Sequence, residues 1–173
     1  RYRLPWGMNF WVPQTGKMGD GWAYTYDADK IRGFKQTHQP SPWINDYGQF
    51  SIMPITGKAV FDQDQRASWF SHKAETATPY YYKVYLADHD VVTEIAPTER
   101  AAAFRFTFPE NDHSYVVVDA FDNGSFVKSS LRKTRLSVIR PRIAVVYRII
   151  SKTISLSNLI NLSLMKQLLP MQL

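Results

Sequence analysis

Six short segments between Phe50 and Phe121 are rich in β-branched and aromatic residues, and turn-forming residues separate them. Alternation is clear in two of them, because Tyr82, Val84 and Leu86 share one face, as do the three phenylalanines of the fifth segment. No stretch has a convincing helical period. The expected strands are Phe50–Pro54, Trp69–His72, Tyr80–Leu86, Val91–Ala96, Ala103–Phe108 and Tyr115–Phe121. Short strands at this spacing predict an all-β fold, a β-sandwich.

The first 49 residues have a different character, with many glycines and prolines, and we expect loops there. They are also rich in aromatic rings: Trp6, Phe10, Trp11, Trp22, Tyr24, Tyr26, Phe34, Trp43 and Tyr47. Flat rings on loops suit sugar recognition, because a pyranose presents a face of C–H groups that stacks on a π system. The alternative is that the rings cover the open end of the sandwich, and we favour this for most of them.

Charge divides the chain at Lys128. Residues 1–128 hold all 15 acidic residues and 13 basic ones, a net charge of −2, whereas residues 129–173 hold 8 basic residues and no acid. All five tryptophans and all eight glycines also precede Lys128. A single domain rarely changes composition so abruptly, so we predict a β-sandwich over residues 1–128 and a separate basic tail over residues 129–173.

Other features exclude several classes of protein. The absence of cysteine excludes disulfides and thiolate metal sites. No stretch reaches the roughly 18 apolar residues of a membrane-spanning helix, so no membrane span is expected. The sequence begins at Arg1 and not at methionine, and we therefore expect a fragment.

The densest polar cluster lies between Gly33 and Gly48, where hydrogen-bonding side chains surround Trp43. These side chains are Thr37, His38, Gln39, Asn45 and Asp46. Such a mixture suits polyol recognition, although the polar groups of a structural loop can also satisfy its own backbone.

Sequence motifs for metal binding or nucleophilic catalysis are weak. His38 with Asp46, and His72 with Glu75, are unaccompanied pairs without a recognised metal-ligand spacing, and no metal site is predicted in this chain. There is no nucleophile-elbow sequence. A pair of carboxylates for glycoside chemistry cannot be chosen from spacing alone.

Several separated motifs between residues 5 and 128 resemble the N-terminal domain of glycoside hydrolase family 92, the calcium-dependent exo-acting α-mannosidases. They are Pro5-Trp6-Gly7-Met8, Gly33-Phe34, Thr37-His38, Asp46-Tyr47-Gly48, Met53-Pro54, Phe70-Ser71-His72-Lys73-Ala74-Glu75, Tyr80-Tyr81, Thr98-Glu99-Arg100 and Phe108-Pro109. The resemblance implies an N-terminal sandwich of the galactose-mutarotase-like supersandwich type. In the parent enzyme this sandwich packs on a larger (α/α) barrel domain, with the active site between the two.

The same resemblance implies an inverting exo-α-mannosidase, secreted, periplasmic or on the cell surface, that acts on mannose-containing glycans. The acid, the base and most calcium ligands would belong to the barrel domain, which this chain lacks. We therefore expect no catalytic residue here and no activity from the chain alone. The sandwich, cut short, would also be incomplete.

Candidate sugar-binding residues come from the matched motifs. Trp6 and Gly7 match the family's aromatic–glycine pair near the terminal mannose, with tryptophan where phenylalanine is commoner. Thr37 and His38 match the family's loop. Many members have Leu-Ser-Gly after this pair, whereas this chain has Gln39-Pro40-Ser41-Pro42-Trp43, and we expect Trp43 to shape the subsite of the leaving sugar. The predicted set is Trp6, Gly7, Thr37, His38, Trp43 and Asp46.

The tail suggests a product of reading the wrong frame. Adding one base ahead of the back-translated codons of residues 143–155 and regrouping them gives NSGGVPDNFKNYF, a glycine-rich and aromatic string that resembles the next segment of family 92 proteins. A lysine codon AAA followed by ATC has four successive A bases, and losing one yields Lys128-Ser129. We predict a frameshift after Lys128 and an unreliable, disordered tail. Resequencing the DNA across codon 128 tests this.

Two competing functions stay open. The first is a stand-alone carbohydrate-binding β-sandwich module. The second rests on the tail alone, whose basic residues suggest binding to membranes or nucleic acid. The tail contains no nucleic-acid-binding motif, so no nucleic-acid partner is predicted.

Overall fold

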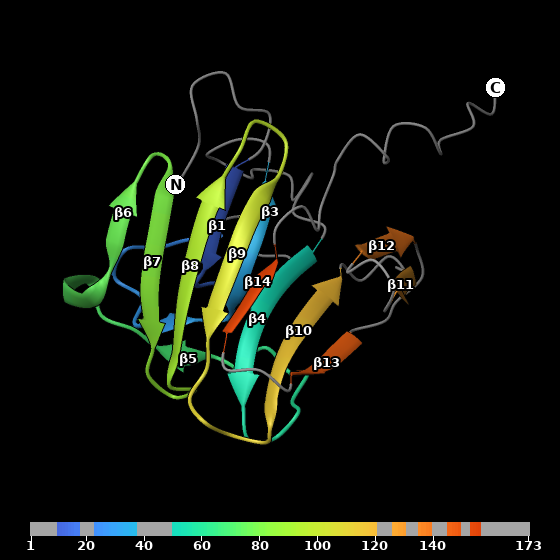
Figure 1. Ribbon diagram of the computed structural model, residues 1–173. Coiled ribbons are helices and arrows are strands. Elements are labelled where there is room, and N and C mark those ends of the chain that lie inside the picture. Colours follow the sequence, from blue (N-terminus) through green and yellow to red (C-terminus); the bar gives the residue numbers. More distant parts are fainter. Residues whose placement is uncertain are drawn as a thin grey trace.

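The computed structural model describes residues 10–17, 23–37 and 50–120, together with the backbone of four later strands, β11 to β14 (Figure 1). Two five-stranded sheets dominate this part of the chain. The first sheet has the order β1 (Phe10–Gln14), β3 (Gly33–Thr37), β4 (Phe50–Thr56), β10 (Ser114–Ala120) and β13 (Val145–Ile149). The second has the order β14 (Thr153–Leu156), β9 (Ala102–Thr107), β8 (Val91–Pro97), β7 (Tyr81–Leu86) and β6 (Thr76–Thr78). All neighbouring strands in both sheets are antiparallel.

Smaller elements complete the described fold. The two-residue strands β2 (Lys30–Ile31) and β5 (Ser68–Trp69) pair with each other, and a short 3-10 turn, η1, covers His72–Ala74. β11 (Phe126–Ser130) pairs with β12 (Arg135–Ile139). No helix in these ranges is long and apolar enough to cross a membrane.

The hydrophobic core lies between the two sheets. Trp11 of β1 meets Phe104 of β9 at a ring-centroid distance of 4.7 Å, and Phe34 of β3 meets Tyr82 of β7 at 6.2 Å. These edge-on ring contacts join the sheets directly, and they supply stabilisation beyond the burial of apolar area. The structure therefore confirms the predicted all-β sandwich.

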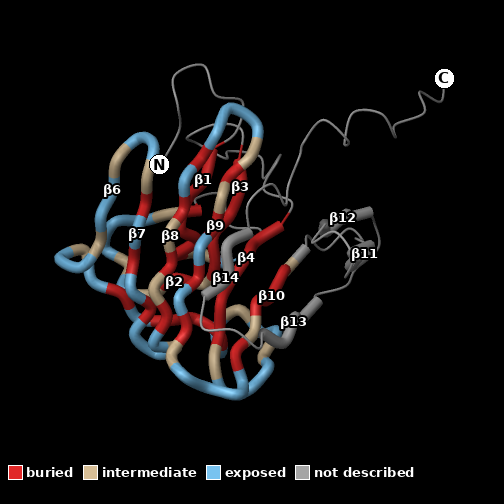
Figure 2. Tube along the Cα trace, in the orientation of Figure 1, coloured by how far each residue is buried: buried red, intermediate tan, exposed pale blue. Residues whose placement is uncertain are grey.

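The two sheets differ in how they meet solvent (Figure 2). Strands β7 and β9 alternate between buried and exposed positions, so the second sheet has one open face. Strands β1 and β3 are buried at every position. Val116, Val117 and Val118 of β10 are also all buried, as their continuous apolar run predicts. Strands β1 and β3 and the middle of β10 are thus covered on both faces.

The expectation of loops throughout residues 1–49 is wrong, because β1, β2 and β3 lie there. Their sequence pattern is hidden by a proline within β1 and a glycine at the start of β3. Pro13 is tolerated because β1 is the edge strand of its sheet. Gly33 is required because a β-carbon there would collide with the side chain of Ser51 on the neighbouring strand. Trp11, predicted as a loop ring, is instead a fully buried core residue.

Strands continue beyond the boundary predicted at Lys128. β11 itself crosses that residue, β13 pairs with β10, and β14 pairs with β9. Backbone pairing does not test the reading frame of the gene, so the division at Lys128 and the frameshift stay predictions.

Candidate functional site

One end of the first sheet gathers four strand ends that are far apart in the sequence. Phe10, which begins β1, is paired with Thr37, which ends β3, and Phe50, which begins β4, is paired with Ala120, which ends β10. We call this edge the site end; it is the upper end of the first sheet in Figure 1. Because the sheet is antiparallel, the chain enters β1 at Phe10, leaves β3 at Thr37 and enters β4 at Phe50 along this same edge.

Five of the six predicted sugar-binding residues lie outside the described residues: Trp6, Gly7, His38, Trp43 and Asp46. Their segments nevertheless join the described chain at the site end. Gly7 precedes Phe10 by three residues, His38 directly follows Thr37, and residues 38–49 connect Thr37 to Phe50.

Thr37 is the one predicted site residue that the structure describes. It ends β3 at the site end, and its side chain is buried. Alternation along β3 puts Thr37 on the same face as Lys35, and puts Phe34 on the opposite face, toward the second sheet. Thr37 therefore belongs to the face of the first sheet that points away from the core.

That outer face carries a row of polar residues next to Thr37. Cross-strand pairing aligns Lys35 of β3 with Ser51 of β4, and Ser51 with Asp119 of β10. Lys35 and Ser51 are buried, and the Asp119 side chain is 18% exposed. Buried charges are costly unless they are paired, so the charged members of this row, Lys35 and Asp119, need partners.

Arg66 supplies the partner for Asp119. Its guanidinium is completely buried and donates from Nη2 to Asp119 Oδ2 at 2.6 Å. Nε donates to the carbonyl of Arg32 at 3.0 Å, and Nη1 donates to the carbonyl of Phe61 at 2.8 Å. One residue therefore connects β10 to two separate loops. Sequence reasoning missed both Arg66 and Asp119, and the one available signal was an acidic residue directly after the buried valines.

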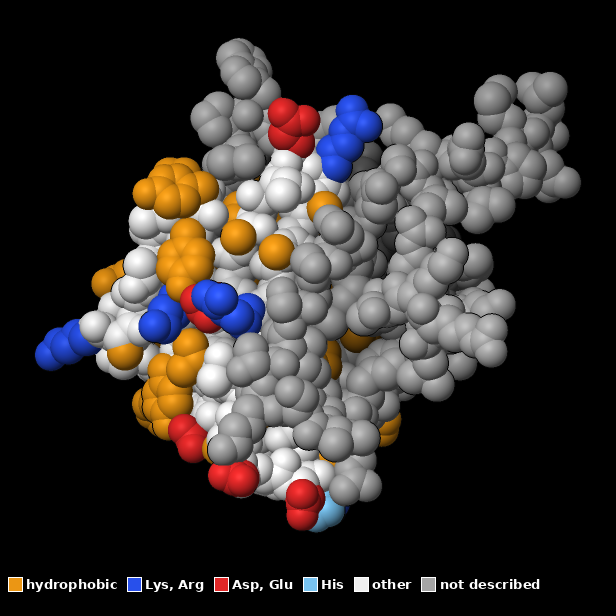
Figure 3. All heavy atoms as spheres, in the orientation of Figure 1, with side chains coloured by type: hydrophobic (Ala, Val, Ile, Leu, Met, Phe, Trp, Pro, Cys, Tyr) orange, Lys and Arg blue, Asp and Glu red, His pale blue; other side chains and the backbone are white. Residues whose placement is uncertain are grey.

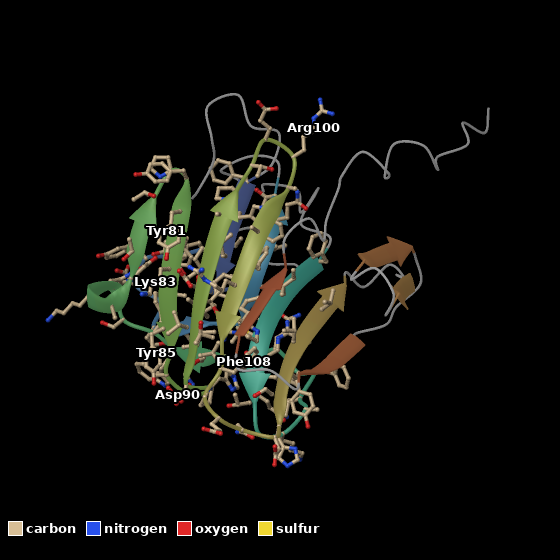
Figure 4. The ribbon with its side chains drawn as sticks, viewed as in Figure 1. Tyr81, Lys83, Tyr85, Asp90, Arg100 and Phe108 are labelled. Carbon is tan, nitrogen blue, oxygen red and sulfur yellow. The ribbon has the colours of Figure 1, made fainter. Side chains whose placement is uncertain are left out.

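The turn between β8 and β9 lies at the site end as well. His89, in the turn between β7 and β8, contacts the opposite end of β4 through Thr56, whose amide donates to His89 Nδ1 at 3.3 Å. The next turn must then lie at the other end of the sandwich, near Thr37. In it, Thr98 Oγ1 accepts a hydrogen bond from the Ala101 amide at 3.0 Å, and Arg100 projects outward (Figure 4).

His72 and Glu75, one of the two candidate metal-binding pairs in the sequence, contact each other directly. His72 Nδ1 lies 2.7 Å from Glu75 Oε2, and His72 Nε2 lies 2.8 Å from the carbonyl oxygen of Tyr26, whose ring stacks on the imidazole at 4.2 Å. The hydrogen bond to Glu75 raises the pKa of His72. Burial, with a smaller contribution from the Glu75 charge, raises the pKa of nearby Tyr24 to about 12.

Both nitrogens of the His72 ring are thus engaged by protein atoms. Across the described ranges there is no cluster of three or more His, Asp or Glu side chains that could hold a metal ion. His38 and Asp46, the other pair, lie outside those ranges.

Comparison with known proteins identifies related chains. Residues 2–154 match the model of the glycosyl hydrolase family 92 N-terminal domain. An inverting mannosidase of family GH92 from Bacteroides thetaiotaomicron is 48% identical with a TM-score of 0.72, over 82% of this chain and 19% of that one. A GH92 α-mannosidase from the same organism, solved with mannoimidazole, is 33% identical with a TM-score of 0.62, over 69% of this chain and 17% of that one.

A secreted protein is also related by sequence. An uncharacterized secreted glycosidase of Arthroderma benhamiae is 25% identical over 116 residues, which is 63% of this chain and 15% of that protein. The chain therefore spans less than a fifth of the length of each of these relatives.

Proposed function

Because the chain belongs to glycoside hydrolase family 92, through its N-terminal domain, we propose that it is the sugar-contacting part of an α-mannosidase. The parent enzyme would remove terminal α-mannosyl residues from glycans. The observation that carries this proposal is the family match over residues 2–154, supported by two mannosidases of the same fold.

The site end of the first sheet is where the sugar would bind. Trp6 would stack on the face of the terminal mannose, and Gly7 would let the backbone approach the ring. Thr37, His38 and Asp46 would hydrogen-bond to hydroxyl groups, while Trp43 would border the leaving sugar. The convergence of Phe10, Thr37 and Phe50 supports this grouping, since all the segments concerned start or finish there.

Catalysis would come from the remainder of the parent chain. An inverting glycosidase uses one carboxylic acid to protonate the leaving oxygen and one carboxylate to activate a water on the other face of the ring. We assign neither group to this chain, and we expect the chain alone to be inactive. Calcium, where the parent enzyme uses it, would be held mainly by oxygen ligands of the (α/α) barrel domain.

The location proposed for the parent enzyme is extracellular or periplasmic. The support for this location is that one relative carries the name of a secreted glycosidase.

Activity measurements test the proposal. The chain alone and the full-length parent, encoded by the gene with its downstream DNA, would be assayed for release of mannose from α-linked mannobioses. We expect no release by the chain alone and release by the parent. In the parent, Trp6→Ala and Trp43→Ala should each lower kcat/KM at least tenfold, because each removes a stacking ring.

Trp69→Ala is the matched control. Trp69 is 48% exposed and lies on β5, away from the site end, so the same truncation there should leave kcat/KM unchanged. The proposal would be contradicted if Trp6→Ala, Trp43→Ala and Trp69→Ala lowered kcat/KM equally, or if the full-length parent had no mannosidase activity. Micromolar binding of mannobiose by residues 1–128 alone, measured by calorimetry, would favour the stand-alone binding module.

A further inference from the structure

The outer face of the second sheet is open to solvent. In Figure 3 the coloured side chains of described residues lie uncovered over β6 to β8. Three residues of β7, namely Tyr81, Lys83 and Tyr85, point to this face because the residues between them are buried in the core. They lie one below another along the strand (Figure 4).

Hydrogen bonds hold both tyrosine rings in place. The Tyr81 hydroxyl donates to Glu94 Oε1 at 2.5 Å, and the Tyr85 hydroxyl donates to Asp90 Oδ1 at 2.8 Å. A ring whose orientation is already restricted loses little conformational entropy when a ligand stacks on it. Both rings are therefore prepared for a contact that the described residues do not supply.

An ion pair lies between the two rings. Cross-strand pairing aligns Lys83 of β7 with Glu94 of β8, and Glu94 with Arg105 of β9. Arg105 donates to Glu94 through Nε at 2.5 Å and through Nη2 at 2.6 Å, a bidentate geometry. These hydrogen bonds lower the pKa of Glu94 to about 2, so its carboxylate stays ionised and compensates the charge of Arg105.

Short side chains on the neighbouring strands leave the rings of Tyr81 and Tyr85 accessible from the solvent side. Near Tyr81, the adjacent strand β8 carries Ala96, and Ala96 is paired with Ala103 of β9. Tyr85 is paired with Val92, which has a short side chain, and Tyr85 itself is 41% exposed. The surface therefore carries one accessible tyrosine at each end and charged groups between them.

We propose that this surface, the tyrosine platform (Tyr81, Lys83, Tyr85, Glu94 and Arg105), binds a neutral oligosaccharide at a second site, distinct from the site end. The tyrosine rings would stack on the C–H faces of two hexoses. The free N–H groups of Arg105 and the ammonium of Lys83 would donate to hydroxyl oxygens between them. Tyr85 lies four residue steps along the strand from Tyr81, roughly 13 Å, so the ligand is longer than a single sugar.

Charge and polarity on this face favour a neutral glycan over other occupants. Because Glu94 already compensates Arg105, Lys83 is the one uncompensated charge among the five platform residues, and the Asp90 carboxylate lies at the Tyr85 end, so this surface attracts a polyanion such as nucleic acid only weakly. The centre of a protein–protein interface is usually depleted of charged residues, whereas here the charges occupy the centre. The two fixed rings with donors between them match a polyol that has alternating C–H faces and hydroxyl groups.

Binding of linear oligosaccharides by the whole 173-residue chain tests the platform. Calorimetry would use a neutral mannohexaose, free mannose, and an acidic oligogalacturonate of equal length. We expect the mannohexaose to bind at least tenfold more tightly than mannose or the oligogalacturonate. Tyr85→Ala should weaken this binding roughly tenfold, which corresponds to about 1.4 kcal/mol.

Two further variants sharpen the test. Tyr81→Phe keeps the ring but removes its hydrogen bond to Glu94, so a smaller, several-fold loss is expected. Phe61→Ala, which truncates an exposed ring outside the platform, should bind normally. Unchanged circular dichroism would show that each variant folds.

Three results would overturn the proposal: no binding by the unaltered chain, binding unaffected by Tyr85→Ala, or tighter binding of the acidic oligosaccharide. The measurement concerns binding by this chain and not mannose release by the parent enzyme. Failure of the platform therefore leaves the proposed function standing, and failure of the proposed function leaves the platform standing.

Discussion

The contact between Gly33 and Ser51 makes a quantitative prediction about the first sheet. Adding a β-carbon at Gly33 places it against the Ser51 hydroxyl, with the carbonyl oxygen of Ile52 also close, at 3.3 Å. Overpacking of this kind costs about 1–3 kcal/mol. Each kcal/mol lowers the melting temperature by about 2–4 °C in a chain of this size. Gly33→Ala should therefore melt measurably below the unaltered protein.

Ser51 supplies the matched partner for a double-mutant cycle. Its hydroxyl is buried and has no hydrogen-bond partner among the described residues, so Ser51→Ala removes a desolvated polar group. Alone, Ser51→Ala should be neutral or stabilise by about 1 kcal/mol. Together with Gly33→Ala it also removes the colliding oxygen, so the double variant should regain most of the loss, with a coupling energy of at least about 1 kcal/mol.

Urea unfolding followed by tryptophan fluorescence measures all four corners of the cycle. Additive effects, within about 0.5 kcal/mol, would show that the Ser51 hydroxyl is not the group that excludes a side chain at Gly33. A neutral Gly33→Ala would refute the close approach of β3 to β4 itself.

Three further outcomes are expected from charged groups. The pKa of Glu94 falls from 4.5 to about 2. The ionised carboxylate therefore stabilises the folded state above pH 4.5, and this contribution is lost as the pH falls through about 2. Glu94→Gln should remove this acid dependence from unfolding curves. The pKa of His72 lies above 6.5. The protonated imidazole therefore stabilises the folded state below pH 6.5, and this contribution is lost as the pH rises through the raised pKa. In NMR titrations, Glu75→Gln should return the pKa of His72 toward 6.5. Arg66→Met leaves the carboxylate of Asp119, which is 18% exposed, without its ion-pair partner and should cost about 1–3 kcal/mol in urea unfolding, whereas adding Asp119→Leu should recover part of that loss.

Sequence reasoning predicted the second sheet better than the first for a physical reason. Strands with one wet face alternate, and β7 and β9 carry that pattern clearly. Strands β1 and β3 are buried on both faces, so Trp11 and Lys35 are both inside and the periodic signal disappears. The burial of Lys35 depends on groups outside its own strand, which no local pattern reveals.

The candidate site shows the same limit. The resemblance to family 92 points to Thr37 as a sugar-binding residue, and that role stays a prediction; sequence reasoning placed Thr37 in a loop, whereas it ends β3. Arg66 and Asp119 were missed, because 53 residues of sequence separate the two ends of that ion pair. Long-range polar partners of this kind are set by tertiary packing, and short motifs do not encode them.

The gathering of strand ends at Phe10, Thr37 and Phe50 also bears on how the protein can diversify. Each of these residues is buried in the sandwich, so the framework at the junctions is firmly held. Residues 38–49 connect two of these anchors, Thr37 and Phe50. Under the proposed function, exchange of this segment between relatives should transfer glycan preference while the β-sandwich keeps its stability. On that proposal a new specificity needs the replacement of one segment only, while the buried anchors and the core stay as they are.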